Sequence, residues 1–562
     1  MRKHAVQPLH PGSVTFVAPT TSQSKLQSPK RKEGTSHGPV KQFSSSDEAI
    51  EGVGEFGAFQ IYMCLVLQYS AIIGAGIFAL SNFGQLFPIY SCTTGTEQPQ
   101  QLDYEYTHTS SYVCSLLHNC TNVTLIHRYF LSMMDEWFLV CERQPYMQLI
   151  LFAAGLGRTF GSIIGGHVGD YFGRKAALYP SQFGICILSS LSIASTAWYS
   201  FAICLFLVGV CYGIGETSAS VLIMEMTTNR YRWIAHASLQ WTVQYPLVAL
   251  IAYVTGNWRM YLVIINVIFA PLLVFFLIFM ESPRFLIYHQ QMMRAAKTLS
   301  DIGSERWNRT CGEISESQLV AIPTRNTPPV DPRYPGPLHL LSRRALLTLT
   351  LMLAMVFRSL LTNLFLQDAS NESGNPFLNI ALFGTIRIWV PFTIIFLDRK
   401  WKRFGRRACF MTFQLAVTVV LILDTAFAVA GLLGGDVAHH EGLLARTLGL
   451  LGASLSASGC WMAVEQYVIE AYPTAIRCIA YGWISSMDGI GSLLSPLLLG
   501  LVTVWGHLPC VILLALAVLL LPTAYFVLPE TKFQPLTDRN QEPQTNRQQQ
   551  PHNENTSSES EV

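Results

Sequence analysis

The sequence predicts an all-α membrane protein that crosses the bilayer twelve times. Only 13% of its 562 residues are charged, against roughly a quarter in soluble proteins, and 50% are hydrophobic. The apolar residues gather in long runs, and the charges are confined to short stretches between them. Because the runs do not alternate apolar with polar residues, they exclude a membrane-spanning β-barrel.

Twelve runs are long enough to cross the membrane, since a helix of about 20 residues spans about 30 Å of hydrocarbon. The predicted spans are 59–80, 146–166, 176–197, 201–223, 234–256, 260–280, 345–367, 377–397, 408–433, 443–466, 479–503 and 507–528. Residues 1–55 contain no apolar core, so we expect no cleavable signal peptide and a first span that serves as a signal anchor.

Basic residues mark one side of this topology. Short basic clusters fall at residues 174–175, 230–232, 343–344 and 399–407 and at Arg477, which alternating helices place on the same side. The positive-inside rule assigns this side to the cytoplasm, so we expect both termini to be cytoplasmic.

The spans divide into two halves that repeat a motif. We expect a disordered tail (1–55), a first six-helix half (56–280), a proline-rich cytoplasmic loop (281–344), a second six-helix half (345–530) and a disordered tail (531–562). "DYFGRKAALY" begins at Asp170 and "KRFGRRACFM" at Lys402, each between the second and third span of its half. Two related six-helix halves are the architecture of transporters whose substrate site lies between the repeats.

The long segment 82–145 is predicted to lie outside the cell. It contains four cysteines, Cys92, Cys114, Cys120 and Cys141. In an oxidising compartment they predict two disulfides, with three pairings open. The sequons at Asn119 and Asn122 predict glycosylation in the same segment.

Several charged residues fall inside the predicted spans, where each charge is a functional hypothesis because its burial is costly. They are Arg158, Glu216, Arg358, Arg387, Asp424, Glu465 and Asp488. Asp488 is the only charge between Arg477 and His507. Trp241 and Tyr245 share one helix face and could offer aromatic faces to a cation.

Enzyme motifs are missing from the sequence. No Walker loop of the form GxxxxGK[ST] occurs, and the pair His439-His440 lacks the spacing of metal ligands. We therefore expect no enzyme, no ATP-driven pump, no metal, no cofactor and no nucleic-acid partner.

Five motifs, in order and in register, resemble those of one family. They are "EWFLVCERQP" (136–145), "GGHVGDYFGRK" (165–175), "ESPRFL" (281–286), "EAYPTAIRCIAYG" (470–482) and "PETK" (529–532). The chain resembles the organic cation/anion/zwitterion transporters (solute carrier family 22-like) of the major facilitator superfamily. The resemblance spans residues 55 to 532 and implies the major facilitator fold. It also implies transport of small organic ions across the plasma membrane by alternating access.

The resemblance also implies roles for charged residues. The gating charges that would hold the cytoplasmic side shut are Asp170, Arg174, Glu225, Glu470 and Arg477. Asp488 matches an aspartate of the cation transporters, so it would line the cavity and attract a cation, and the prediction leans slightly to cations. In the rival interpretation Asp488 pairs with Arg358 or Arg387 and is neutralised. If both arginines instead line the cavity unpaired, an anionic or zwitterionic substrate is favoured.

The chain also departs from the family's pattern. Tyr171 replaces a motif arginine, Lys402 stands in an acid's place, and Arg387 stands where glutamate is common. These altered charges favour an alternative function, a transport-deficient receptor or scaffold that binds ligand through segment 82–145. The final residues Ser560-Glu561-Val562 fit a PDZ-domain ligand, so the expected partners are a small organic ion, the lipid bilayer and a PDZ domain.

Overall fold

The structure is a computed structural model of the chain. It describes residues 42–84, Leu86, 89–93, 100–103, 114–115, His118, Cys120, 122–126, 130–240, 242–269, 280–310, 314–320, Ile322, 337–371, 375–433, 438–501, 508–532, Gln534 and Leu536. Residues from Gln42 onward form one compact unit.

Each predicted span contains helical structure in the residues that the structure describes, and the span 260–280 is described only to Phe269 and at Met280. The first half contains α2 (Ala58–Phe83), α5 (Gln144–Phe172), α6 (Arg174–Ile193), α7 (Trp198–Glu225), α8 (Arg232–Ala237) with α9 (Gln244–Thr255), and α10 (Trp258–Val263) with the π-helical η2 (Ile264–Phe269). The second half contains α15 (Pro337–Asn371), α16 (Pro376–Lys400), α17 (Arg406–Leu433), α18 (Ala438–Leu455) continued by the π-helical η3 (Ser456–Cys460) and α19 (Trp461–Ala471), α20 (Arg477–Gly500) and α21 (Leu508–Val527). Among the described residues, nine helices are long and apolar enough to cross a membrane.

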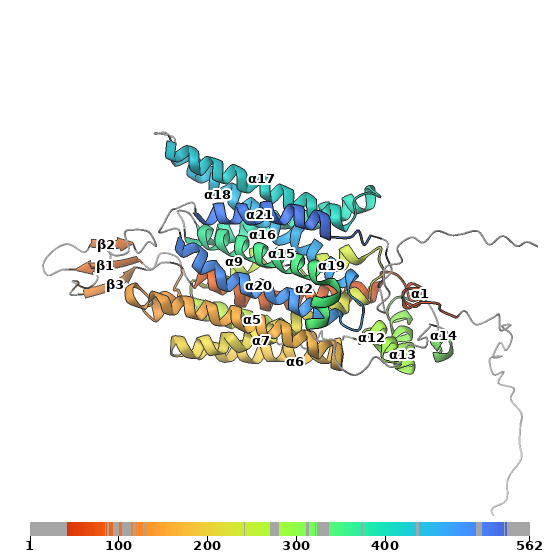
Figure 1. Ribbon diagram of the computed structural model, residues 1–562. Helices are drawn as coiled ribbons and strands as arrows, with labels where there is room; N and C mark the ends of the chain where they lie inside the picture. Colours follow the sequence, from red (N-terminus) through yellow and green to blue (C-terminus); the bar gives the residue numbers. More distant parts are fainter. Residues whose placement is uncertain are drawn as a thin grey trace, which may run out of the picture. The chain divides into compact units, whose positions relative to one another are not determined.

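A small antiparallel sheet extends from one end of the helices (Figure 1). Its strands are β1 (Ile89–Thr93), β2 (Gln100–Asp103) and β3 (Asn122–Ile126), in the order β2-β1-β3. Tyr90 of β1 lies opposite Leu102 and Leu125. The sequence analysis predicted no strand here. We call this end of the bundle, where α2 ends and α5 begins, the sheet end.

Short helices gather at the opposite end, where α6, α17 and α20 begin, and we call it the loop end (Figure 1). They are α1 (Ser46–Gly52), α12 (Pro283–Tyr288), α13 (Met292–Gly303) and α14 (Glu316–Val320). Near the sheet end lie α4 (Met133–Glu136) and the 3₁₀ turn η1 (Cys141–Arg143). α1 falls inside the segment predicted to be a disordered tail. It is ordered because Asp47 forms an ion pair with Arg284, and Ser46 accepts a hydrogen bond from the same guanidinium at 3.0 Å.

Glycines bring α5 and α7 into direct backbone contact. A Cβ atom added to Gly161 would lie 2.2 Å from the Val210 carbonyl oxygen, and one added to Gly213 would lie 2.5 Å from the Ser162 amide nitrogen. Small residues at such crossings let membrane helices approach closely enough for van der Waals packing to hold them. This contact fixes the position of α5, whose side chains enter both the cavity and the gate.

Candidate functional site

A cavity of about 340 Å³ lies between the two halves. Its charged lining residues are Arg158, Glu216, Arg358, Arg387 and Asp488. Asn82, Gln148 and Leu497 line it near the sheet-end termini of α2, α5 and α20, so the cavity extends toward the sheet end. Its size falls in the range of small-molecule sites, about 300–1,000 Å³.

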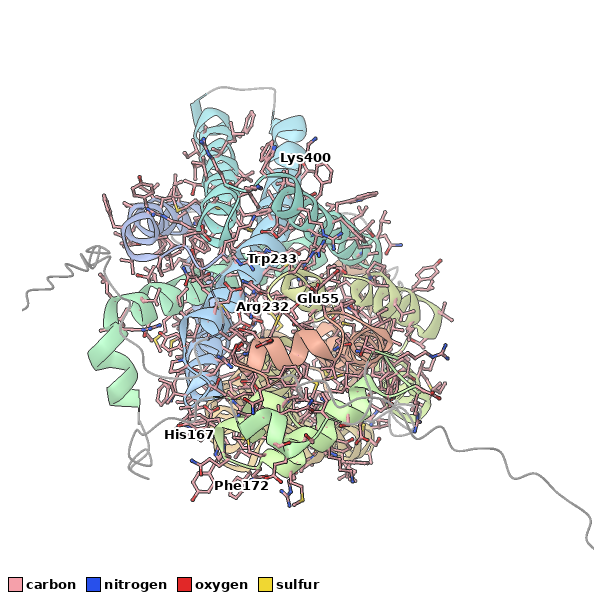
Figure 2. The ribbon with its side chains drawn as sticks, turned by 90° about the vertical axis from the view of Figure 1, so that its right-hand side faces the viewer. Glu55, His167, Phe172, Arg232, Trp233 and Lys400 are labelled. Carbon is pink, nitrogen blue, oxygen red and sulfur yellow. A yellow bond between two sulfur atoms is a disulfide. The ribbon has the colours of Figure 1, made fainter. Side chains whose placement is uncertain are left out.

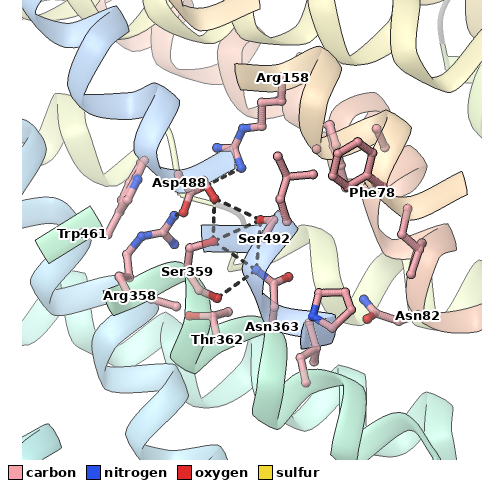
Figure 3. A pocket seen from close by; sticks show the side chains of 18 of the residues that line it. Phe78, Asn82, Arg158, Arg358, Ser359, Thr362, Asn363, Trp461, Asp488 and Ser492 are labelled. Atoms are coloured by element: carbon pink, nitrogen blue, oxygen red, sulfur yellow. Dashed lines mark hydrogen bonds and ion pairs between the residues drawn. The ribbon is translucent and has the colours of Figure 1, made fainter. Parts of the chain in front are cut away.

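Asp488 of α20 lies between two guanidinium groups, one from each half of the protein. Arg158 of α5 and Arg358 of α15 each donate to one of its carboxylate oxygens (Figure 3). Arg358 is one of the partners that the rival interpretation expected. Arg158 was recognised as a charge inside a span but not as a partner of Asp488. The side chain of Asp488 is almost fully buried, so both of its oxygens are committed.

Glu216 of α7 extends this network inside the first half. Arg158 donates to it from Nε at 3.1 Å and from Nη2 at 2.9 Å, in the forked geometry that a guanidinium offers a carboxylate. The same guanidinium lies 5.5 Å from the ring of Tyr212 and 5.9 Å from that of Phe78. Arg158 is therefore held by two carboxylates and two aromatic faces.

A polar cluster joins α15 to α20 beside Asp488 (Figure 3). The Ser359 hydroxyl donates to the carbonyl oxygen of Asp488 at 2.7 Å, and the Asn363 amide donates to Ser492 Oγ at 3.0 Å. A Cβ atom on Gly491 would lie 2.5 Å from that of Ser359, so the two helices need a glycine at this crossing. The cluster fixes where Asp488 enters the cavity.

Arg387 of α16 differs from the other two cavity arginines, because none of the described carboxylates forms an ion pair with it. Its Nε donates to Ser458 Oγ at 2.9 Å and its Nη2 to the Ala457 carbonyl at 3.1 Å. Its guanidinium lies 5.6 Å from the ring centre of Tyr245 and 5.1 Å from that of Phe383. No carboxylate of the described chain lies within ion-pair distance of it.

The π-helical segment η3 makes this arrangement possible. Ala457 and Ser458 lie in η3, where the wider i to i+5 pattern interrupts the α-helical ladder. The Ser458 carbonyl also accepts a hydrogen bond from Gln240 of the other half at 3.0 Å. Of the two aromatic residues predicted to face a substrate, Tyr245 lines the cavity, whereas Trp241 lies outside the described residues.

Four of the predicted gating charges lie together at the loop end and link the two halves: Asp170, Arg174, Glu225 and Arg477. Glu225 of α7 accepts from Arg477 of α20 at 2.6 Å and from Arg174 at 3.2 Å. Asp170 accepts from the backbone amide of Ile479 at 2.8 Å. The Glu225–Arg477 and Asp170–Ile479 contacts cross between the halves, and the side chains of Glu225, Arg174 and Arg477 are fully buried.

A second set around Glu470 repeats this arrangement with the halves exchanged. Glu470 of α19 accepts from Arg406 at 3.1 Å within its own half and from Arg232 of the first half at 3.4 Å. Asp398 lies 3.1 Å from Arg406, as Asp170 lies 3.1 Å from Arg174. Figure 2 looks onto this end, with Arg232 labelled near the boundary between the halves.

Arg232 and Arg406 were not among the predicted gating charges. The signal for Arg406 was the repeated motif itself, because Arg406 is the arginine of "FGR" in the second half as Arg174 is in the first. Arg232 lies in a basic cluster that the sequence analysis used only for orientation. Its partner is 238 residues away, which no local pattern indicates.

The two repeated motifs also share a capping interaction. The carboxylate of Glu281 accepts from the backbone amide of Arg174 at 3.0 Å, and that of Glu530 from the amide of Arg406 at 2.9 Å. Each acid thus occupies a helix N-terminus, where negative charge is stabilised. Gly173 precedes α6 with φ 110°, and a Cβ there would lie 2.4 Å from Glu281. Burial raises the pKa of Glu281, although its hydrogen bond from Ser282 and the charge of Arg174 oppose this.

The cysteines at the sheet end are partly assigned by the structure. Cys114 and Cys141 form a disulfide, and Cys120 is also disulfide-bonded. The side chain of Cys92 is outside the described part, as is Asn119. Asn122 is the first residue of β3.

Two six-helix halves with a cavity between them are the architecture of a membrane transporter of the major facilitator superfamily. Residues 93–542 match the sugar (and other) transporter family, so the chain belongs to this family. Its fold resembles that of the proton:xylose symporter XylE bound to 6-bromo-6-deoxy-D-glucose, with a TM-score of 0.55 and 16% identity over 87% of this chain and 98% of that chain. It also resembles the partially occluded, inward-open xylose transporter XylE from E. coli, with a TM-score of 0.53 and 15% identity over 85% of this chain and 100% of that chain.

Curated relatives fit the resemblance to the organic-ion transporters. "Solute carrier family 22 member 16" of Bos taurus is 24% identical over 81% of this chain and 77% of that protein. "Organic cation transporter protein" of Drosophila melanogaster is 24% identical over 88% and 93%. "Solute carrier family 22 member 6-A" of Xenopus laevis is 27% identical over 73% and 72%. The predictions of the family, of the major facilitator fold and of a transporter rather than an enzyme are confirmed.

Proposed function

We propose that this transporter carries small organic ions by alternating access, and that its cavity binds a carboxylate or comparable anionic group at Arg387. The observation that carries the proposal is the distribution of charge in the cavity. Three arginines and two carboxylates line it, and Asp488 and Glu216 are both bound to Arg158 or Arg358. Arg387 has no acid in the described part of the chain and is 6% exposed.

The surroundings of Arg387 strengthen its attraction for an anion. At 4 Å a pair of unit charges gains about 1 kcal/mol in water and about 4 kcal/mol at the effective dielectric of a protein surface. The rings of Tyr245 and Phe383 beside the guanidinium exclude water from part of this site. An anionic substrate group there would complete the neutralisation of the cavity.

A cationic substrate is the second candidate. The carboxylates of Glu216 and Asp488 line the cavity, and one relative is named an organic cation transporter protein. A cation that binds Asp488 must displace Arg158 or Arg358 from it. That exchange is costly, since removing one partner of a buried ion pair destabilises by about 3–5 kcal/mol. A zwitterion could meet Arg387 with its carboxylate and leave the Asp488 network intact.

The test is uptake of radiolabelled glutarate, glycine betaine and tetraethylammonium by surface-expressed protein. The variants are Arg387→Gln, Asp488→Asn and, as a control, Arg294→Gln at an exposed site of α13. We expect uptake of glutarate or betaine to fall at least tenfold in Arg387→Gln and to stay unchanged in Arg294→Gln. Tetraethylammonium uptake that survives Arg387→Gln but is lost in a folded Asp488→Asn would support the cation instead. No uptake of any probe by wild type at the surface would favour the receptor or scaffold.

We also propose a plasma-membrane location with the loop end and both termini in the cytoplasm. The basic clusters support this orientation, because Arg174, Arg406 and Arg477 all lie at the loop end. An N-terminal epitope tag should bind antibody on permeabilised cells alone. We propose glycosylation at Asn119 or Asn122 on the opposite side, tested by a mobility shift with glycosidase. A PDZ partner at Ser560-Glu561-Val562 should be lost when one glycine is appended to Val562.

A further inference from the structure

Three polar contacts cross between the halves in a ladder from the gate to the cavity. One side of the ladder is α8 with the turn that follows it, and the other is α19 with η3. The contacts are Arg232–Glu470 (3.4 Å), His236–Glu465 (3.6 Å) and Gln240 to the Ser458 carbonyl (3.0 Å). The first contact belongs to the gate, and the last joins the halves beside Arg387. The middle contact, His236–Glu465, has no role in the proposed gate or substrate site.

His236 and Glu465 are completely buried yet poorly satisfied. The exposed fraction of the side chain is 0% for His236 and 2% for Glu465. Neither imidazole nitrogen has a hydrogen-bond partner in the described structure, and the nearest carboxylate oxygen is that of Glu465 at 3.6 Å. The ring of His236 packs edge-on against Trp461, 5.0 Å away, and Trp461 lines the cavity. A buried histidine and a buried glutamate thus face each other across 3.6 Å.

The other titratable groups around the pair are already engaged. Tyr481 of α20 faces Glu465, and its hydroxyl donates to Ser220 at 2.9 Å. Further away the charges that act on Glu465 are Glu216 of α7, Arg158 of α5 and Arg358 of α15. These three side chains belong to the network of Asp488. On α16, Arg387 donates to Ser458 and Ala457. Toward the gate, Glu470 is bound by Arg232 and Arg406.

The number of protons on the pair follows from its burial. With no proton the pair carries one negative charge, with two protons one positive charge, and with one proton it is neutral overall. Burying an unpaired charge without water is far more costly than burying a neutral pair. The closed state therefore holds one proton, shared as imidazole with carboxylic acid or as imidazolium with carboxylate.

Opening the loop end changes the number of protons that the pair binds. The halves must separate there, which breaks the contact and hydrates both side chains. The ordinary pKa values of exposed histidine and glutamate are about 6.5 and about 4.3, so at neutral pH most of the hydrated pair holds no proton. We propose that His236 and Glu465 form a proton-binding site that takes up one proton when the loop end closes and releases it when that end opens.

The site makes the conformational equilibrium depend on pH. With one proton linked to closure, each unit of pH changes the ratio of open to closed protein by up to about tenfold, and acid favours the closed loop end. The proposal depends on alternating access but not on the identity of the substrate. Its test can therefore be made without substrate, and its failure would leave the assignment of Arg387 untouched.

The experiment measures the opening of the loop end by double electron–electron resonance. Spin labels are placed at Tyr171→Cys and Lys402→Cys, two exposed positions in the equivalent motifs of the two halves, with the free cysteines replaced. The protein is reconstituted in lipid nanodiscs and titrated without substrate between about pH 5 and 8, the range in which histidine changes charge. We expect the open fraction to rise with pH in the otherwise wild-type protein. An open fraction independent of pH would overturn the proposal.

Three variants assign the effect to the pair. Glu465→Gln leaves a buried neutral histidine that binds a proton only when the loop end opens, so its open fraction should fall rather than rise with pH. His236→Gln leaves a buried carboxylic acid that still takes up a proton on closing, so its open fraction should already rise between about pH 5 and 6.5, where the hydrated wild-type pair keeps a proton on the histidine. The double variant should show no pH dependence. The control is His289→Gln, which alters an exposed histidine at the same end of the bundle; its ring nitrogen bonds the carbonyl of Phe285 rather than the other half. It should keep the full pH dependence. A rise of the open fraction with pH that persists in folded Glu465→Gln or in the folded double variant, or that disappears in His289→Gln, contradicts the proposal, and either of the first two variants suffices if the other fails to fold.

Discussion

Removing the charge of Glu225 should open the loop end. Glu225→Gln keeps the shape of the side chain but leaves Arg174 and Arg477, both fully buried, without their shared counter-ion. Leaving a buried charge uncompensated costs about 3–5 kcal/mol. The cost falls on the closed state, where the Glu225–Arg477 contact exists. At 1.4 kcal/mol for each factor of ten, the ratio of open to closed protein should rise roughly 100- to 4,000-fold.

The distance between spin labels at Tyr171→Cys and Lys402→Cys measures this change. Glu225→Gln should shift the spin-label distances from short to long. Glu470→Gln should do the same, because Glu470 binds Arg406 and Arg232 in the equivalent arrangement. Glu51→Gln, on the exposed face of α1, should leave the distances unchanged. If folded Glu225→Gln protein shows the wild-type distances, the buried ion pairs do not hold the gate closed.

Three further perturbations test the packing, the disulfide and the N-terminal helix. Gly161→Ala should lower the unfolding temperature, because overpacking costs about 1–3 kcal/mol, whereas Gly500→Ala should not, since nothing lies within 4 Å of a Cβ there. Cys141→Ser should destabilise the sheet end by up to about 3–4 kcal/mol, seen as faster proteolysis of segment 82–145, because it opens a loop whose cysteines are 27 residues apart; unchanged proteolysis would contradict this. Burial raises the pKa of Asp47, but the positive charges of Arg284 and Arg232 lower it by more, so the pKa lies below its ordinary value of 3.8. A carboxylate with a lowered pKa stabilises at all pH above its ordinary value, so hydrogen exchange of α1 at fixed intrinsic rate should be constant from about pH 5 to 8 and should increase below about pH 4. Asp47→Asn should show the increased exchange at every pH, and exchange equal to wild type would rule out the Asp47–Arg284 contact.

The helical architecture could be predicted because it depends on local composition. Each of the twelve apolar runs is helical over most of its described residues, since a backbone in lipid must satisfy its own hydrogen bonds. The repeated "FGR" motif likewise indicated two related halves. The sheet at the sheet end was missed because its strands are only four or five residues long. The π-helical turn at Ser458 was missed because its contacts are with residues distant in sequence: Arg387 donates to the Ala457 carbonyl and Gln240 to the Ser458 carbonyl.

The sequence by itself determined which residues are candidates: charges inside apolar runs are few, and each is costly enough to stand out. Only the tertiary structure decided how they pair. Arg158 and Asp488 are 330 residues apart, and so are placed together by the packing of α5 against α20 rather than by any local pattern. The packing of distant helices also leaves Arg387 without an acid among the described residues and brings His236 opposite Glu465. Ion pairs in a membrane protein act over a few ångströms, so their partners are set by how distant helices cross, which the sequence of either helix does not contain.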